Sequence, residues 1–93
     1  MKIFVLLGSL SAFLGVALGA FGAHGLKNKV TPDMLSVWET AVLYHLVHAI
    51  GLLLIGILCH LMPDVPLLRN AGWSILVGTL LFSGSLYVLV LTG

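Results

Sequence analysis

The sequence predicts an all-α integral membrane protein with three transmembrane helices, and two observations carry this prediction. Of its 93 residues, 60% are hydrophobic and only 8% are charged, whereas a soluble domain carries about 25% charged residues. Three long stretches, residues 3–23, 41–62 and 71–92, contain no Lys, Arg, Asp or Glu. Each would be about 31 Å long as a helix, which matches the roughly 30 Å hydrocarbon core of a bilayer.

Helices are expected rather than a barrel, because the stretches lack the alternation of polar and apolar residues that barrel strands show. We therefore expect one transmembrane domain covering residues 1–93. The first stretch could also be a secretory signal peptide, because Lys2 precedes it and small residues lie near its end. It exceeds the roughly 7–15 apolar residues typical of such peptides, so we expect it to be kept as a span.

The segment between the first two stretches contains a helix start. Thr31 is suited to cap the helix, Pro32 to take its first position and Asp33 to lie near the positive end of the helix dipole. A helix from Pro32 to Met62 would be longer than the membrane requires. We expect its first two turns, which include Trp38 and Glu39, to lie at the membrane interface or in a polar cleft.

The second connection, Pro63–Pro66, contains two prolines that stop one helix before the next begins. Asn70 is then placed to cap the third span. Two basic residues fall on each side of the membrane, so charge alone does not orient the chain. With the amino terminus included, we expect the N-terminus to lie in the cytoplasm. The single cysteine, Cys59, is inside a span and is expected to be a small packing residue.

Small residues recur at helical spacing in the first span and predict close helix packing. Glycine destabilises a soluble helix by roughly 1 kcal/mol relative to alanine, but in a membrane small residues let helix backbones approach closely. The third span offers a second small face, and we expect both spans to contact the second span through such faces. Alternatively, one stripe faces another protein or a second copy. The packing positions are Gly8, Ala12, Gly15, Gly19 and Gly22 in the first span, and Gly78, Ser83, Gly84 and Ser85 in the third.

Ionisable side chains in or beside the spans are the candidate functional groups, because such residues are costly in a membrane and usually face the bundle or a watery cavity. His45 and His48 are i, i+3 neighbours, and His24 and Glu39 belong to the same side of the membrane. A cluster of these four is geometrically possible. It could be structural, with neutral imidazoles bonded across helices. It could instead bind a metal or haem, or form a path for protons or a small solute.

Three segments resemble the signatures of a known family. They are Gly19–Leu26, then Trp38–Ala41 followed by Tyr44 and His48, and finally Leu81–Tyr87. In this order, over essentially the whole chain, they are similar to the small membrane proteins known as domain of unknown function 423, related to transmembrane protein 256 of animals. The resemblance implies a four-helix membrane protein and no established activity. The last helix of that pattern is missing here, so we expect the chain to be truncated or only partly represented.

The resemblance also selects among the polar residues. His24, Tyr44 and His48 match motif positions, whereas His45 does not, which favours His24 with His48 over the neighbouring histidine pair. Together with Glu39, the three matching residues form the candidate polar cluster.

No paired carboxylates, nucleophile with a base, or phosphate-binding loop occurs in the sequence, so we expect no enzyme activity, no catalytic residue and no cofactor or metal. The favoured function is a scaffold, accessory subunit or assembly factor in the plasma membrane of a bacterium. The alternatives are a small transporter, channel or proton-linked carrier lined by the polar cluster, or a haem- or quinone-associated redox subunit. The expected partners are the lipid bilayer and other membrane helices, in a homo-oligomer or a larger complex. No nucleic acid is expected, because the net charge is only +1.

Overall fold

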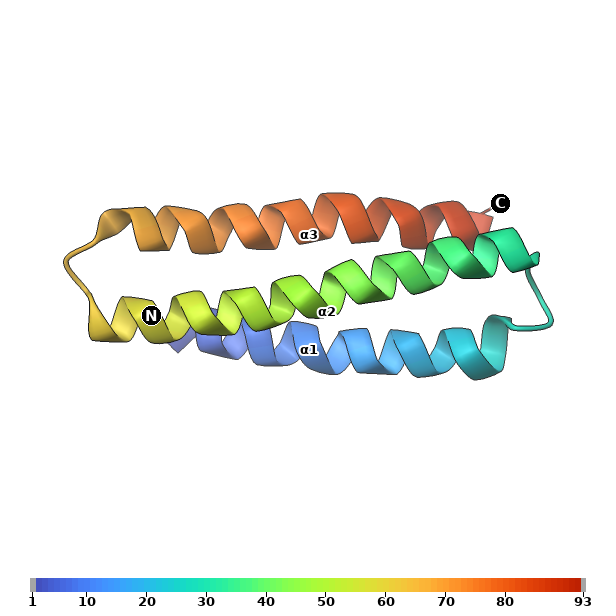
Figure 1. Ribbon diagram of the computed structural model, residues 1–93, viewed down its shortest axis with the longest axis horizontal. Coiled ribbons are helices and arrows are strands. Elements are labelled where there is room, and N and C mark those ends of the chain that lie inside the picture. Colours follow the sequence, from blue (N-terminus) through green and yellow to red (C-terminus); the bar gives the residue numbers. More distant parts are fainter. Residues whose placement is uncertain (1, 93) are drawn as a thin grey trace.

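The computed structural model describes residues 2–92 and shows them folded almost entirely as helix (Figure 1). Along the chain, α1 (Lys2–Phe21) leads into a π-helical turn, η1 (Gly22–Leu26), and is followed by α2 (Pro32–Leu61) and α3 (Pro66–Thr92). The stretches that can cross a bilayer, α1 with η1, α2 and α3, have 25, 30 and 27 residues. The predicted all-α membrane fold with three spans is confirmed.

The start of α2 follows from its sequence. Thr31 Oγ1 accepts a hydrogen bond from the Met34 backbone N–H at 3.2 Å, and Pro32 occupies the first helical position. The helix ends at Leu61, one residue before the predicted end. The capping residues therefore place the start of this helix correctly.

The start of α3 was predicted wrongly. The helix begins at Pro66 instead of after an Asn70 cap, so Arg69 and Asn70 lie within its first turns. Proline suits this place because its fixed φ matches the helix and its missing N–H would be unpaired there anyway. The second proline of the connection thus begins a helix instead of only stopping one.

The end of the first span also differs from a continuous α-helix. After Phe21 the backbone widens into η1, which contains Gly22 and Gly25. A Cβ atom added at Gly25 would lie 2.8 Å from Cε1 of the Phe21 ring, so a side chain there would have to displace that ring. Leu26, at the end of the turn, is buried against the other helices. Turns of this kind are rare and often lie near functional sites.

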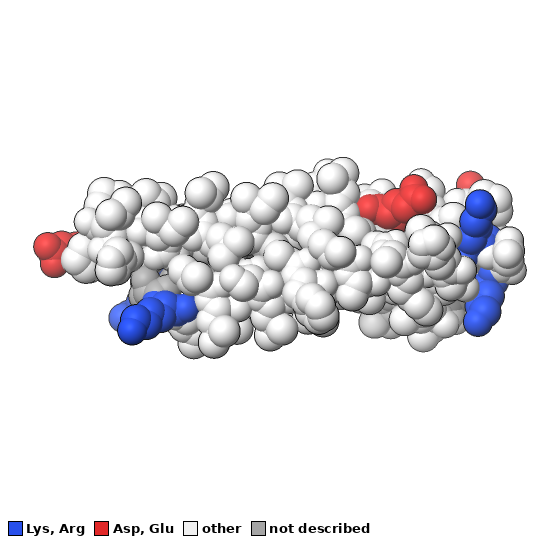
Figure 2. Space-filling model, turned by 90° about the horizontal axis from the view of Figure 1, so that it is seen from below, with Lys and Arg blue, Asp and Glu red and all other residues white. Residues whose placement is uncertain are grey.

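The helices form an elongated, thin bundle in which α2 lies between α1 and α3 (Figure 1). Its principal extents are 50 × 19 × 14 Å. The long dimension exceeds the roughly 30 Å hydrocarbon core, so the helix ends reach the headgroup region. Lys and Arg gather at the two ends of the molecule, and on the face seen in Figure 2 the surface between them is nearly free of charge. This distribution fits a bundle that stands across a membrane.

Two buried clusters lie along the bundle, and each defines one half of the molecule. The Trp38 half, next to the connection between α1 and α2, is centred on Leu26, Trp38 and Val90. The Phe4 half, next to the connection between α2 and α3, is centred on Phe4, Leu52 and Cys59.

Candidate functional site

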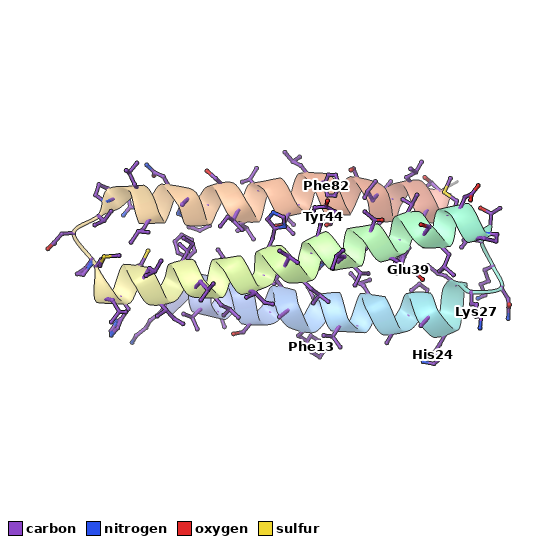
Figure 3. All side chains as sticks on the ribbon, viewed as in Figure 1. Phe13, His24, Lys27, Glu39, Tyr44 and Phe82 are labelled. Atoms are coloured by element: carbon purple, nitrogen blue, oxygen red, sulfur yellow. The ribbon has the colours of Figure 1, made fainter. Side chains whose placement is uncertain are left out.

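The structure does not gather the predicted polar cluster into one site. His24 lies in η1, is exposed and points away from α2 (Figure 3). Glu39 lies in a groove between α1 and α2 together with Gly19 and Gly22. Glu39 and Tyr44 are five residues apart, so at about 100° per residue they project from different sides of α2. Of the four residues, only Tyr44 and His48 contact each other. No group of three potential metal ligands occurs within residues 2–92.

Tyr44 and His48 form a pair on the side of α2 that faces α3. The His48 Nδ1 atom lies 2.6 Å from the backbone carbonyl oxygen of Tyr44. A carbonyl oxygen can only accept, so Nδ1 donates and the Nε2 atom of the neutral ring is an acceptor. The Tyr44 ring packs edge-on against Phe82 of α3, with ring centroids 5.0 Å apart (Figure 3). Both side chains line a groove of about 330 Å³ whose other wall includes Gly78 and Thr79.

His45, which the family pattern had set aside, is the histidine that joins the three helices. It is 7% exposed, and its Nδ1 lies 2.9 Å from Tyr87 Oη of α3. The imidazole also hydrogen-bonds to the backbone of Ser11 in α1. A signal for this role was present in the sequence, because the small residues Ala41 and Ala49 lie one turn to either side of His45 and share its side of the helix. In the structure all three residues are buried.

Two more hydrogen bonds cross between helices near His45. The Trp38 indole N–H donates to the Leu18 backbone oxygen of α1 at 2.9 Å. Ser83 Oγ of α3 donates to the Ala41 backbone oxygen of α2, also at 2.9 Å. Every buried side-chain nitrogen and oxygen within the described residues has a hydrogen-bond partner. These buried polar atoms are therefore used to hold the helices together.

The glycine stripe of α1 lies against α2. A Cβ atom added at Gly8 would lie 2.8 Å from Leu53 Cγ and 3.1 Å from the Leu53 backbone nitrogen. The next positions along the stripe meet α2 in the same way, and Ala12 between them is half-buried. The remaining pairs are Gly15 with Leu46, Gly19 with Val42, and Gly22 with Trp38.

Most of the small residues of α3 do not contact α2, so the expectation that they would was wrong for this helix. Ser83 is buried against Ala41, but a Cβ atom added at Gly78 or Gly84 would have no neighbour within 4 Å. Ser85 is exposed and donates to the Phe82 backbone oxygen of its own helix. The positions Ser74, Gly78 and Ser85 follow helical spacing and are all exposed, so they form one uncovered face.

Three apolar helices joined by buried hydrogen bonds and a glycine-packed interface define a small multi-pass membrane protein. The family described as "Protein of unknown function (DUF423)" matches residues 18–93 of this chain, and the chain belongs to that family.

Curated relatives cover nearly the whole chain. It is 47% identical to UPF0382 membrane protein YwdK of Bacillus subtilis (strain 168), over 99% of this chain and 75% of that protein. It is 48% identical to UPF0382 membrane protein SAB0533 of Staphylococcus aureus (strain bovine RF122 / ET3-1), over 99% of this chain and 74% of that protein. No solved structure matches. The chain is a membrane protein, and its bacterial relatives fit a location in the plasma membrane.

Proposed function

We propose that the protein is a non-enzymatic scaffold or accessory subunit that binds another transmembrane helix on one defined surface. This surface, the α2–α3 face, consists of Tyr44 and His48 of α2 with Ser74, Gly78 and Ser85 of α3. The observation that carries the proposal is the position of the Tyr44–His48 pair beside the open Gly78 position.

Polar atoms on this face lie where lipid would otherwise surround them. Tyr44 is 45% exposed, and it is the thirteenth residue of a 30-residue helix, so its depth is near the middle of the membrane. Polar groups at that depth are costly in lipid and are usually covered by protein. A helix packed over the face would remove Tyr44 and His48 from the hydrocarbon.

The small residues of α3 would let such a helix approach closely. On α1 the equivalent stripe is occupied by α2, but at Gly78 the space beyond the backbone is open. Ser74 and Gly78 have the four-residue spacing that allows backbone contact between membrane helices, and Ser85 lies two turns further along the same face. The acceptor His48 Nε2 adds a chemical requirement. The bound helix should place a hydrogen-bond donor, such as a Ser or Thr hydroxyl or a Trp N–H, opposite this atom.

The positions of the other polar residues favour this proposal over a proton-linked carrier. A carrier needs a continuous row of polar groups, whereas His24 and Glu39 lie on other sides of the bundle. The buried imidazole of His45 is bonded to two neighbouring helices, as expected of a structural group.

The test uses two glycines of α3 that both have open space but lie on different sides. Gly78→Leu should abolish co-purification of partner helices, or of a second tagged copy, from native membranes in mild detergent. Gly84→Leu is the matched control, because Gly84 lies beside α1, in the groove that contains His45. It should leave co-purification unchanged. Equal association in both variants, or proton flux into liposomes that His48→Ala abolishes, would contradict the proposal.

A further inference from the structure

A second groove, on a different side of the bundle from the α2–α3 face, lies between the beginning of α1 and the end of α2. Its volume is about 530 Å³. Apolar side chains form its walls, and its two basic residues, Lys2 and His60, come from the first turn of α1 and the last turn of α2. The groove therefore has a basic mouth at one end of the molecule and an apolar interior.

Gly56 explains why the two helices leave this space. A Cβ atom added there would lie 2.9 Å from Val5 Cγ2 and 3.0 Å from the Val5 backbone nitrogen, so α1 contacts the α2 backbone directly. Next to this close contact, Leu6 and Leu61 project from the two helices and are each 68% exposed. These two leucine side chains form the sides of the groove, and the close contact at Gly56 forms its floor.

The length of the groove fits an acyl chain better than a helix. From Lys2 to Ser9 it extends about 10 Å along α1, within the roughly 15 Å depth of one leaflet of hydrocarbon. A transmembrane helix crosses both leaflets, roughly 30 Å, so most of its length would lie outside a groove this short.

The positive charge at the mouth of the groove favours a lipid with an anionic headgroup. Lys2 carries a positive charge where the helix leaves the hydrocarbon, and no ion pair joins it to a carboxylate within residues 2–92. The acidic residue at this end, Asp64, lines a separate groove with Arg69. We propose that this groove binds one phospholipid with an anionic headgroup. Its phosphate contacts Lys2 and His60, and one acyl chain lies along the groove towards Ser9.

The experiment measures lipid selectivity of the full chain in bilayers by electron paramagnetic resonance. The probes are spin-labelled phosphatidylglycerol and phosphatidylcholine with the same acyl chains. The wild-type protein should immobilise phosphatidylglycerol about five-fold more strongly, as expected for one Lys near an anionic headgroup. Lys2→Gln should remove this preference. Lys29→Gln, which makes the same charge change in the exposed connection between α1 and α2, should keep it.

A third variant tests the groove itself. Ser9 is exposed and lines the inner end, so Ser9→Phe should fill the space without disturbing the helices, which circular dichroism would verify. It should reduce the immobilised fraction of both lipids. The proposal is wrong if the wild-type protein shows no preference, or if Lys2→Gln and Lys29→Gln reduce the preference equally. Displacement of the labelled lipid by millimolar inorganic phosphate would also overturn it, because the site would then bind free phosphate.

Discussion

The Trp38 half and the Phe4 half hold the same helices together by different means. In the Trp38 half, side-chain hydrogen bonds from Trp38, His45 and Ser83 connect α2 to both neighbours. In the Phe4 half, the buried side chains that meet between the helices, Phe4, Leu52 and Cys59, are apolar. The rings of Phe4 and Trp73 pack edge-on with centroids 5.1 Å apart, and the buried Phe4 ring occupies the space that a side chain at Gly72 would need.

This difference indicates that the stability of the bundle and the rotation of each helix depend on different contacts. Lipid tails are as apolar as leucine, so membrane helices gain little from burying apolar area and depend on close fit. The Phe4 half supplies that fit through a large ring seated on glycine. Hydrogen bonds between membrane helices are worth only about 0.6 kcal/mol on average. However, they require particular atoms to meet, as His45 and Tyr87 do, so they fix the rotation of each helix. We expect the Phe4 half to dominate stability and the Trp38 half to dominate register.

The largest effect is expected from Phe4→Ala. Phe4 is fully buried, so truncation leaves a cavity among three helices. The loss in unfolding free energy should be about 2 kcal/mol, below the usual 3–5 kcal/mol for such a change in a soluble protein. In a membrane the truncation removes packing contacts but not the free energy of transfer out of water, since the unfolded helix is surrounded by lipid. Reversible unfolding in bicelles measures it. Phe13→Ala is the control, since Phe13 is 67% exposed and points away from the bundle (Figure 3). A similar loss in both variants would show that close fit in the Phe4 half is unimportant.

An intermediate effect is expected from Gly22→Ala in the Trp38 half. The new Cβ atom would lie 2.5 Å from the indole Nε1 of Trp38, a ring held by its bond to Leu18. Displacing a buried ring should cost about 1–2 kcal/mol, in the range for overpacked cores. Gly78→Ala adds the same methyl group in open space and should leave the unfolding free energy of the isolated chain unchanged or slightly higher. If Gly22→Ala were as harmless as Gly78→Ala, the Trp38 half would be loosely packed.

The outcome of the sequence predictions follows from the same physics. Absence of charge predicted the spans, and the stripe from Gly8 to Gly22 predicted a close contact that α1 makes with α2. The sequence could not show which small face of α3 meets α2. The alanines one turn to either side of His45 indicated a buried position, but the family pattern favoured His48. In a soluble helix, polar residues mark the outer side. In these helices both the lipid-facing and the inward-facing sides are apolar, so helix rotation is set by a few contacts such as Ser83 with Ala41, which are visible only in three dimensions.

The smallest effect is expected from Tyr87→Phe. This change removes the hydroxyl bonded to His45 and keeps the ring packed against Trp38, with ring centroids 4.7 Å apart. The loss should be about 0.6 kcal/mol, and a double-mutant cycle with His45→Phe should give a coupling energy of the same size. Because His45 would lose a partner that fixes α3, the variant should also show a broader distribution of distances between spin labels on α2 and α3. A loss as large as that of Phe4→Ala would mean that hydrogen bonds, and not fit, provide most of the stability. An unchanged distance distribution would mean that register is set elsewhere in the bundle.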